Sequence, residues 1–343
     1  MMMNEHGGPD SGPPVMHDFS SNANPLGAPD EVVQAIHAAD RQRYPDPAYQ
    51  ALRDHLAEVL GVQAERVLPT AGSSEAIRRL TLAASLRGLR QVWVPQPGYG
   101  DYRSAALALG LKVRGYADGD ALLTGLSAHD EPSLVWLCEP CNPTGQSLPP
   151  LFWAALAQLR SQRPITLVLD RAYEPLRLVG QDPVPADLAD QCWQLCSPNK
   201  ALGLTGVRAG YAIAPVDDNA VLDAAAFRAL APSWVLSAEG VAMLQAWHQP
   251  GTQAWLARSR QTLALWMAAQ RTALTRMAWH CQPSVVPFML ARPAHPLSAL
   301  RGHGIKLRDA TSFGLPGWVR LSAQAPHAQQ ALLQALAQTE VSP

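Results

Sequence analysis

The sequence predicts an α/β protein: a large domain with a mostly parallel sheet covered by helices, and a smaller C-terminal α+β domain. Between residues 66 and 214, short apolar runs such as QVWVP and ITLVLD alternate with helical stretches. Runs that are apolar throughout are typical of parallel strands with helices on both faces. After residue 220, long Ala- and Leu-rich helical stretches replace this pattern, which predicts the second domain.

The domain limits are expected where these patterns change. At 343 residues the chain is long enough for one large and one smaller core. We expect an N-terminal arm and part of the small domain over residues 1–40, the large domain over 41–235 and the small domain over 236–343.

Composition limits the class of protein and its partners. Apolar residues make up 48% and charged residues 16%, which favours a large core and a further surface buried against another subunit. A net charge of −1 without a basic stripe argues against nucleic-acid binding. No apolar run could span a membrane, and the N-terminal segment does not resemble a secretory signal. Five cysteines, an odd number, do not suggest a disulfide framework, so we expect a cytoplasmic protein with reduced thiols.

The N-terminal part predicts an extended arm and two helices. Residues 1–18 are rich in Gly, Pro and Asp, as expected of an arm. Asp30 can cap a helix that runs to about Ala39. After the rigid RYPDP segment, a second helix is expected from about Ala48 to Leu60, because Gly61 is a common helix terminator.

Six apolar runs define the predicted sheet of the large domain: RVLPT, QVWVP, SLVWLCEP, ITLVLD, CWQLC and VRAGYAIAP. Helices are expected between them, through Ile77 and Ala84, up to Leu107, and over Leu151–Leu159. Polar residues cluster just past the carboxyl ends of the strands, where ligands bind in such sheets.

The C-terminal part predicts four helices and two strand regions. The helices are expected over Asp223–Leu230, Ser237–Trp247, Thr252–Met277 and Ala325–Ala337. The strands are expected within SVVPFMLARP and GIKLRD.

Lys200 is the candidate for amine chemistry. It is one of only three lysines, the others being Lys112 and Lys306. A lysine that forms a Schiff base must have a neutral amine, which requires a desolvated site or nearby positive charge. Ser197 and Arg208 could hold a phosphate beside it. The alternative is a solvated lysine in a surface loop.

The polar residues at the strand ends supply the parts of a pyridoxal-phosphate site. Lys200 would form a Schiff base with the cofactor aldehyde, and Asp170 would keep the ring nitrogen protonated, which makes the ring an electron sink. The other contacts would be Asn142 and Tyr173 to the ring hydroxyl, Tyr99 on the ring face, and Ser73, Ser74, Ser197 and Arg208 around the phosphate. Singly, each has an ordinary interpretation, such as a turn cap for Asp170 or a core position for Tyr99. Their joint occurrence in this order favours the cofactor site.

Two cysteine pairs raise the alternative of a structural zinc site. Cys138 and Cys141 form a C-x-x-C motif, and Cys192 and Cys196 form a wider pair. Both pairs include strand-like apolar runs, in which cysteine is usually a small buried hydrophobe. We therefore predict no metal site.

The ordered motifs Asn142-Pro143-Thr144-Gly145, Asp170-x-x-Tyr173, Ser197-x-x-Lys200 and Arg208 resemble those of fold-type-I pyridoxal-phosphate enzymes of the class I/II aminotransferase group. The resemblance covers nearly the whole chain. It implies a homodimer with active sites at the subunit interface, in which Tyr44 reaches the neighbouring subunit's cofactor phosphate. It also implies that Arg320 holds the substrate α-carboxylate through a two-pronged contact.

Two branches of that group fit the sequence. The His6-Gly7-Gly8 arm, DFSSNANPLG, RYPDP and IKLRDATSFGLPGWVR are similar to threonine-phosphate decarboxylases of cobalamin biosynthesis. Histidinol-phosphate aminotransferases share the middle and C-terminal patterns. Both bind a phosphorylated amino compound; Arg308 matches the arginine near the substrate phosphate, and His6 and Asn24 match positions at the same end of the pocket.

The resemblance therefore favours decarboxylation of L-threonine O-3-phosphate to aminopropanol phosphate, with a histidinol-phosphate type of aminotransferase as the alternative. A pyridoxal-phosphate-binding regulator without turnover is the remote alternative. The chain departs from the common pattern at Arg171, where glutamate is frequent, at Asn199, where serine or threonine is frequent, and at Cys141, where asparagine is frequent. The bond that breaks at Cα is the one held perpendicular to the cofactor ring, and a linear sequence does not specify that orientation.

Overall fold

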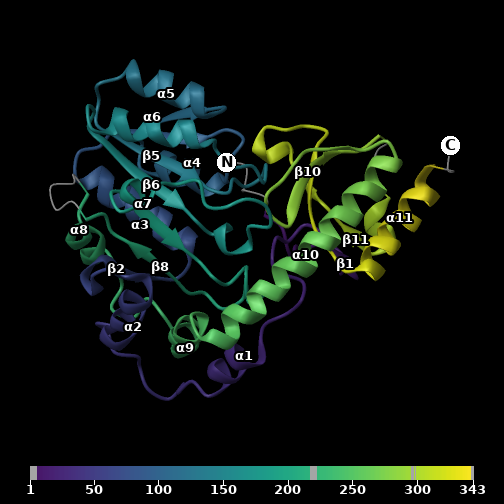
Figure 1. Cartoon of the computed structure of the whole chain (residues 1–343), viewed down its shortest axis with the longest axis horizontal. Coiled ribbons are helices and arrows are strands. Elements are labelled where there is room, and N and C mark those ends of the chain that lie inside the picture. The colour runs from purple at the N-terminus through teal and green to yellow at the C-terminus, as the bar shows by residue number, and fades with distance from the viewer. Residues whose placement is uncertain (1–5, 217–221, 295–296, 298, 341–343) are drawn as a thin grey trace.

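A seven-stranded sheet and a four-stranded antiparallel sheet form the two parts of the protein (Figure 1). The structure is a computed structural model and describes residues 6–216, 222–294, 297 and 299–340. Residues 1–5 of the predicted arm therefore lie outside the described residues. The α/β class predicted from the sequence is confirmed, with a large, mostly parallel sheet and a small antiparallel one.

The large sheet has the strand order β2-β8-β7-β6-β5-β3-β4. Only β8 is antiparallel to its neighbours, β2 and β7. The strands are β2 (Val67–Thr70), β3 (Gln91–Pro95), β4 (Lys112–Tyr116), β5 (Ser133–Cys138), β6 (Ile165–Asp170), β7 (Trp193–Cys196) and β8 (Gly210–Ile213).

Helices cover both faces of this sheet, which explains why its inner strands are apolar throughout. In β5, Leu134 and Trp136 pack on one face with α3 (Ser73–Leu86) and α4 (Gly100–Ala108). Val135 and Leu137 pack on the other face with α5 (Gly119–Ser127) and α6 (Pro150–Arg160). Because successive side chains of a strand point to opposite faces of the sheet, each strand contributes to two separate cores.

The edge strand β4 and the following helix α5 were not predicted. In β4, Lys112 is exposed and Val113, Arg114 and Gly115 are not fully buried. Charged residues are common on edge strands, so the run lacks the apolar pattern of the inner strands. A second difference concerns α1 (Asp30–His37), which is preceded by Pro29 as its N-cap, so Asp30 lies in the first turn instead of capping it.

The small part of the molecule combines segments from both ends of the chain. Its sheet has the order β12-β13-β10-β9, and a separate parallel pair joins β1 to β11. The long helix α10 runs from beside α1 and α9 to this part (Figure 1). The remaining elements are α2 (Gln50–Leu60), α7 (Ala186–Ala189), α8 (Ala224–Ala229), α9 (Ala238–Trp247), α10 (Pro250–Arg276), α11 (Pro326–Glu340), β1 (His17–Asp18), β9 (His280–Cys281), β10 (Phe288–Arg292), β11 (Ile305–Lys306), β12 (Arg308–Asp309) and β13 (Val319–Ser322).

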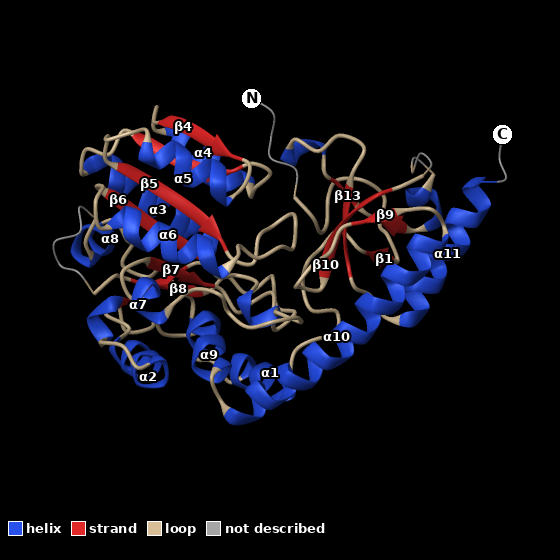
Figure 2. Cartoon of the chain, turned by 45° about the horizontal axis from the view of Figure 1, so that its top comes forward, coloured by secondary structure: helices blue, strands red, loops and turns tan. Residues whose placement is uncertain are grey.

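The carboxyl ends of the inner strands face the small sheet (Figure 2). Their loops therefore meet the N-terminal arm and β13 across the space between the two sheets. Within the described part of the chain, no helix combines the length and apolarity that crossing a bilayer requires.

Candidate active site

A cavity of about 410 Å³ lies where these loops, the N-terminal arm and β13 meet. It brings together most of the predicted site residues: His6, Ser73, Ser74, Tyr99, Asn142, Asp170, Tyr173, Ser197, Lys200, Arg208 and Arg320. Tyr44, Asn24 and Arg308 do not line it.

Lys200 lies in the loop that follows β7 and is half-buried. Its Nζ is 5.2 Å from the centre of the Tyr173 ring. No hydrogen bond or ion pair with another described residue engages this amine. The backbone of the loop is held by the Asn24 N–H, which donates to the Lys200 carbonyl over 2.8 Å. The amine is thus positioned by its backbone and left available to react.

Asp170 ends β6, the strand beside β7 in the same sheet, and is buried at the cavity. The Tyr102 hydroxyl donates to its Oδ2 over 2.7 Å, and the Ala172 N–H donates to Oδ1 over 3.0 Å. Burial raises the pKa of Asp170, while the hydrogen bond from Tyr102 and the charge of Lys200 act in the opposite direction. A carboxylate held this way can face a cationic ring nitrogen.

Tyr102 is a site residue that the sequence does not reveal. It lies in α4 and is fully buried, so its apolar surroundings make it resemble any core aromatic residue. Only the packing of α4 against α3, β3 and β4 brings its hydroxyl to Asp170.

The start of α3 forms a corner of the cavity whose donors suit an anion. The buried Ser73 hydroxyl has no hydrogen-bond partner among the described residues. Gly72 precedes it with φ +92°, and a Cβ built on Gly72 would lie 2.6 Å from Nη2 of Arg208. An unsatisfied hydroxyl at the positive end of a 14-residue helix, beside a guanidinium, fits a phosphate group. This corner therefore fits the phosphate of pyridoxal phosphate.

Ser74 and Tyr99 are joined to each other. The Ser74 Oγ and the Tyr99 hydroxyl oxygen are 2.9 Å apart, and the Tyr99 hydroxyl donates to Asp101 over 2.9 Å. Burial and the charge of Asp101 raise the pKa of Tyr99, so this phenol stays protonated. The buried Asp101 was not predicted, and it fixes the Tyr99 ring at the cavity wall.

The segment DFSSNANPLG contributes Asn22 to the cavity instead of Asn24. The Asn22 Nδ2 donates to the Tyr173 hydroxyl over 3.3 Å. The Asn24 Nδ2 donates to the Ala201 carbonyl over 3.1 Å, so this side chain holds the loop that carries Lys200. The spacing of the two asparagines does not reveal which of them faces the cavity.

Arg320 and Arg308 form the far end of the site, in the small sheet. Arg320 donates to Asn142 Oδ1 over 2.6 Å and to the Ser20 carbonyl over 2.8 Å, and its buried Nε has no partner among the described residues. Burial lowers the pKa of Arg320 to about 10. Arg308 lines an adjoining cavity of about 40 Å³, where it donates to Ser312 over 2.7 Å. His6 lines both cavities.

Tyr44 lies outside this site. It is 78% exposed and stacks on Trp234 with ring centres 4.3 Å apart. Its predicted contact with a neighbouring subunit's cofactor stays a prediction.

The structure locates two of the residues at which the chain departs from the common family pattern. Arg171 forms an ion pair with Asp182 and does not line the cavity. Asn199 is buried and lines the cavity, and its Oδ1 has no hydrogen-bond partner among the described residues.

The two cysteine pairs do not come together as a zinc site would require. Cys138 lies on the cavity wall, whereas Cys192 packs in the core beneath α5 and α6. Among the described residues, no group of three or more His, Cys, Asp or Glu side chains is arranged to hold a metal ion.

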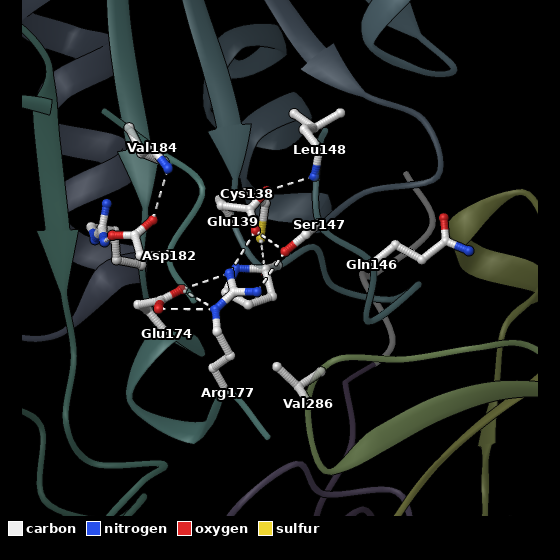
Figure 3. A network of polar contacts seen from close by, with 12 residues as sticks. Cys138, Glu139, Gln146, Ser147, Leu148, Glu174, Arg177, Asp182, Val184 and Val286 are labelled. Carbon is white, nitrogen blue, oxygen red and sulfur yellow. Dashed lines mark hydrogen bonds and ion pairs between the residues drawn. The ribbon is translucent and has the colours of Figure 1, made fainter. Parts of the chain in front are cut away.

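A buried ionic network fixes the two loops that carry Asn142 and Tyr173. Figure 3 shows the Arg177 guanidinium between Glu174 on one side and Glu139 with Ser147 on the other. Glu139 is 1% exposed and also accepts from the Leu148 N–H over 2.9 Å. Because an unpaired buried charge is costly, this network favours one relative position of the loops.

Comparisons with known proteins agree with this geometry. Residues 14–338 match the family model "Aminotransferase class I and II". The chain is 31% identical over 322 residues to the histidinol-phosphate aminotransferase of Granulibacter bethesdensis, covering 89% of this chain and 84% of that protein.

Solved structures share the fold at lower identity. L-threonine-O-3-phosphate decarboxylase from Porphyromonas gingivalis superposes with a TM-score of 0.77 at 22% identity, covering 94% of this chain and 99% of that one. Histidinol-phosphate aminotransferase from Sinorhizobium meliloti, solved with pyridoxal 5'-phosphate, gives a TM-score of 0.77 at 22% identity, covering 93% and 89%.

The cavity offers a lysine amine, a buried carboxylate and a corner for a phosphate, and the family match spans almost the entire chain. The cofactor predicted from the sequence is the one on which this family depends. The chain belongs to the class I and II aminotransferase family and is a pyridoxal-phosphate-dependent enzyme.

Proposed function

We propose that the protein is an aminotransferase for a small phosphorylated amino compound of the histidinol-phosphate type. The observation that carries this proposal is the similarity to histidinol-phosphate aminotransferases at 30–31% identity over most of the chain. The resemblance seen in the sequence favours decarboxylation, with this activity as the alternative. Threonine-phosphate decarboxylase is matched here as a solved structure at 22% identity, a level that supports the fold alone.

The residues of the cavity would have different roles in such a reaction. When bound, pyridoxal phosphate supplies an electron sink for the electron pair left at the substrate Cα. Lys200 would hold the cofactor and then move the proton at Cα, because its amine has no competing partner among the described residues. Asp170 would hold the proton on the ring nitrogen. Ser73, Ser197 and Arg208 would bind the phosphate of the cofactor.

Arg320 and Arg308 would bind the anionic groups of the substrates. A guanidinium presents two parallel N–H groups to a carboxylate or phosphate, which suits both residues. Arg320 already donates to Asn142 and Ser20, which leaves its Nε, without a partner among the described residues, and its remaining N–H groups for an incoming carboxylate. The bond to Asn142 helps to set the orientation of the guanidinium that would receive the substrate.

One observation supports decarboxylation of threonine phosphate as the second candidate. The His6-Gly7-Gly8 arm, which the sequence shares with the decarboxylases, lines the cavity. A Cβ on Gly7 would lie 2.0 Å from the Ser20 carbonyl oxygen, and the Gly8 N–H donates to the Ser20 hydroxyl over 2.9 Å. The arm thus packs closely against the backbone that also binds Arg320, the group expected to orient a substrate carboxylate.

Two parallel incubations of the purified holoenzyme separate the candidates. One contains histidinol phosphate with 2-oxoglutarate, and the other contains threonine phosphate. Glutamate formed in the first alone supports the aminotransferase. Carbon dioxide released in the second alone replaces it with the decarboxylase. A visible cofactor band that responds to no amino compound would favour a regulator without turnover.

The active form is proposed to be a homodimer in which Tyr44 reaches the partner's cofactor phosphate. The exposed stack of Tyr44 on Trp234 supports this, because exposed aromatic pairs are enriched at interfaces. Sedimentation of the holoenzyme tests the oligomeric state, and a Tyr44→Ala variant with unchanged cofactor affinity would exclude the contact.

A further inference from the structure

The C-x-x-C motif lies at the point where β5 enters the active-site loop. Cys138 is the last residue of β5 and lines the cavity, and Cys141 immediately precedes Asn142. The Cys138 thiol donates to the Pro140 carbonyl over 3.4 Å. Cys138 Sγ also accepts from the Asn142 N–H over 3.4 Å. Cys138 Sγ therefore lies beside the peptide bond that joins Cys141 to Asn142, a residue that lines the cavity.

The two thiols differ in reactivity. Hydrogen bonds from Cys138 and from the side chain and N–H of Thr144 lower the pKa of Cys141. The contact with Cys141 and burial raise the pKa of Cys138. Burial raises the pKa of Cys192 to about 12 and that of Cys196 to about 11, and it also raises the pKa of Cys281.

Within the C-x-x-C pair, exposure favours Cys141. Cys141 is partly exposed, as are Cys196 and Cys281, whereas Cys138 is buried against the cavity. Because the thiolate is the attacking form of cysteine, Cys141 is the first site for an oxidant and Cys138 is placed to resolve the product.

We propose that Cys138 and Cys141 form a reversible redox site that reacts with low-molecular-weight disulfides such as oxidised glutathione. The Cys141 thiolate attacks one sulfur of the oxidant, which forms a mixed disulfide and releases the first thiol. Cys138, after losing its proton to solvent, attacks Cys141 Sγ and releases the second. The oxidant is reduced to two thiols, and the pair is oxidised to one intramolecular disulfide.

Oxidation would alter the cofactor pocket through Asn142. A disulfide requires the two sulfurs to be about 2.05 Å apart, which the two free thiols of this pair are not. Cys138 Sγ would then leave its contact with the Asn142 N–H, and Asn142 Oδ1 accepts the short bond from Arg320. The oxidised protein is therefore expected to lose activity and cofactor affinity together, and to regain both on reduction.

The test uses the holoenzyme in glutathione buffers of increasing disulfide content. Free thiols are alkylated, and the disulfides are located by peptide mapping without reduction. We expect a Cys138–Cys141 disulfide to form before Cys281 is modified. We also expect kcat/KM to fall roughly 10-fold, the size of one lost buried hydrogen bond, and to recover with dithiothreitol.

Variants separate this site from the other cysteines. Cys141→Ser should keep its activity across the same buffers, and Cys281→Ser should remain as sensitive as the unaltered protein. If Cys141→Ser folds poorly, Cys141→Asn introduces the residue that is frequent in similar enzymes. The disulfide map of the unaltered protein decides the matter without either variant.

Three results would overturn the proposal. One is modification of Cys281 or Cys196 while Cys138 and Cys141 remain free thiols. The second is a disulfide that leaves kcat/KM and the visible band of bound cofactor unchanged. The third is equal sensitivity of Cys141→Ser. The map and the cofactor band do not depend on which reaction the enzyme catalyses, so they stay informative if the proposed function fails.

Discussion

The two walls of the active-site cavity differ in how their polar groups are engaged. On the wall formed by the large sheet, the Lys200 amine has no bonded partner among the described residues, and neither has the Ser73 hydroxyl. On the wall formed by the small sheet, Arg320 already bonds Asn142 and Ser20, and Arg308 bonds Ser312. The first wall is prepared for one resident ligand. The second wall already uses some of its guanidinium donors within the protein, while the Arg320 Nε has no partner among the described residues, so changes there should give graded effects.

The sharpest test of the first wall is Lys200→Ala. If Lys200 holds the cofactor and moves the proton at Cα as proposed, removing its amine removes both functions, so kcat should fall by at least about 10³-fold with either substrate pair. Steady-state and single-turnover assays measure this loss. Lys112→Ala, on the exposed edge strand β4, is the matched control and should retain full activity. Substantial turnover by Lys200→Ala would show that Lys200 is not the catalytic amine.

The next largest effect is expected for Asp170→Asn, which keeps the shape and removes the charge. We expect kcat to fall about 10²-fold, because several kcal/mol of interaction with a ring cation are lost. A loss below about 3-fold, read from the same assays, would show that Asp170 does not hold the proton on the ring nitrogen.

Tyr102→Phe gives a smaller, pH-dependent version of the same effect. The hydroxyl lowers the pKa of Asp170, so its removal should raise that pKa further. The carboxylate then becomes charged only at higher pH, and the acidic limb of the kcat profile should move upward. A kcat profile measured across pH tests this, and an unmoved limb would separate Tyr102 from the function of Asp170.

The first wall could be predicted from the sequence because it follows a local rule. Its residues come directly after apolar strands, and the carboxyl ends of parallel strands lie at the same edge of the sheet. Tyr102 and Asp101 could not be found this way, because they act through a helix whose packing sets their partners.

The second wall depends on contacts distant in sequence, which a linear pattern does not specify. Arg320 meets Ser20 across 300 residues, and Asn22 instead of Asn24 faces the cavity. The edge strand β4 was missed for a different reason, since its charged residues lack the apolar pattern of buried strands.

On the second wall, Arg320→Lys should raise KM about 10- to 100-fold for a carboxylate-bearing substrate. Lysine keeps the charge but offers no planar pair of donors, and it leaves Asn142 and Ser20 with one shared donor group. Cofactor content, measured by visible absorbance, should change little. A variant that loses its cofactor while keeping its KM would place Arg320 on the first wall.

Gly72→Ala should produce the smallest of these effects, and it tests how closely the first wall fits the cofactor phosphate. At φ +92° an alanine is strained, at a cost of about 1–3 kcal/mol, and its Cβ would lie 2.6 Å from Arg208 Nη2. Arg208 is flexible and can move away, but it then leaves the phosphate corner, so cofactor affinity should fall roughly 10-fold with kcat nearly unchanged at saturating cofactor. Gly206→Ala is the matched control, because no atom lies within 4 Å of a Cβ at that position. Cofactor affinity is measured by titration of the apoenzyme. Equal affinity of the two variants would mean that the present position of the Arg208 guanidinium is not required for phosphate binding.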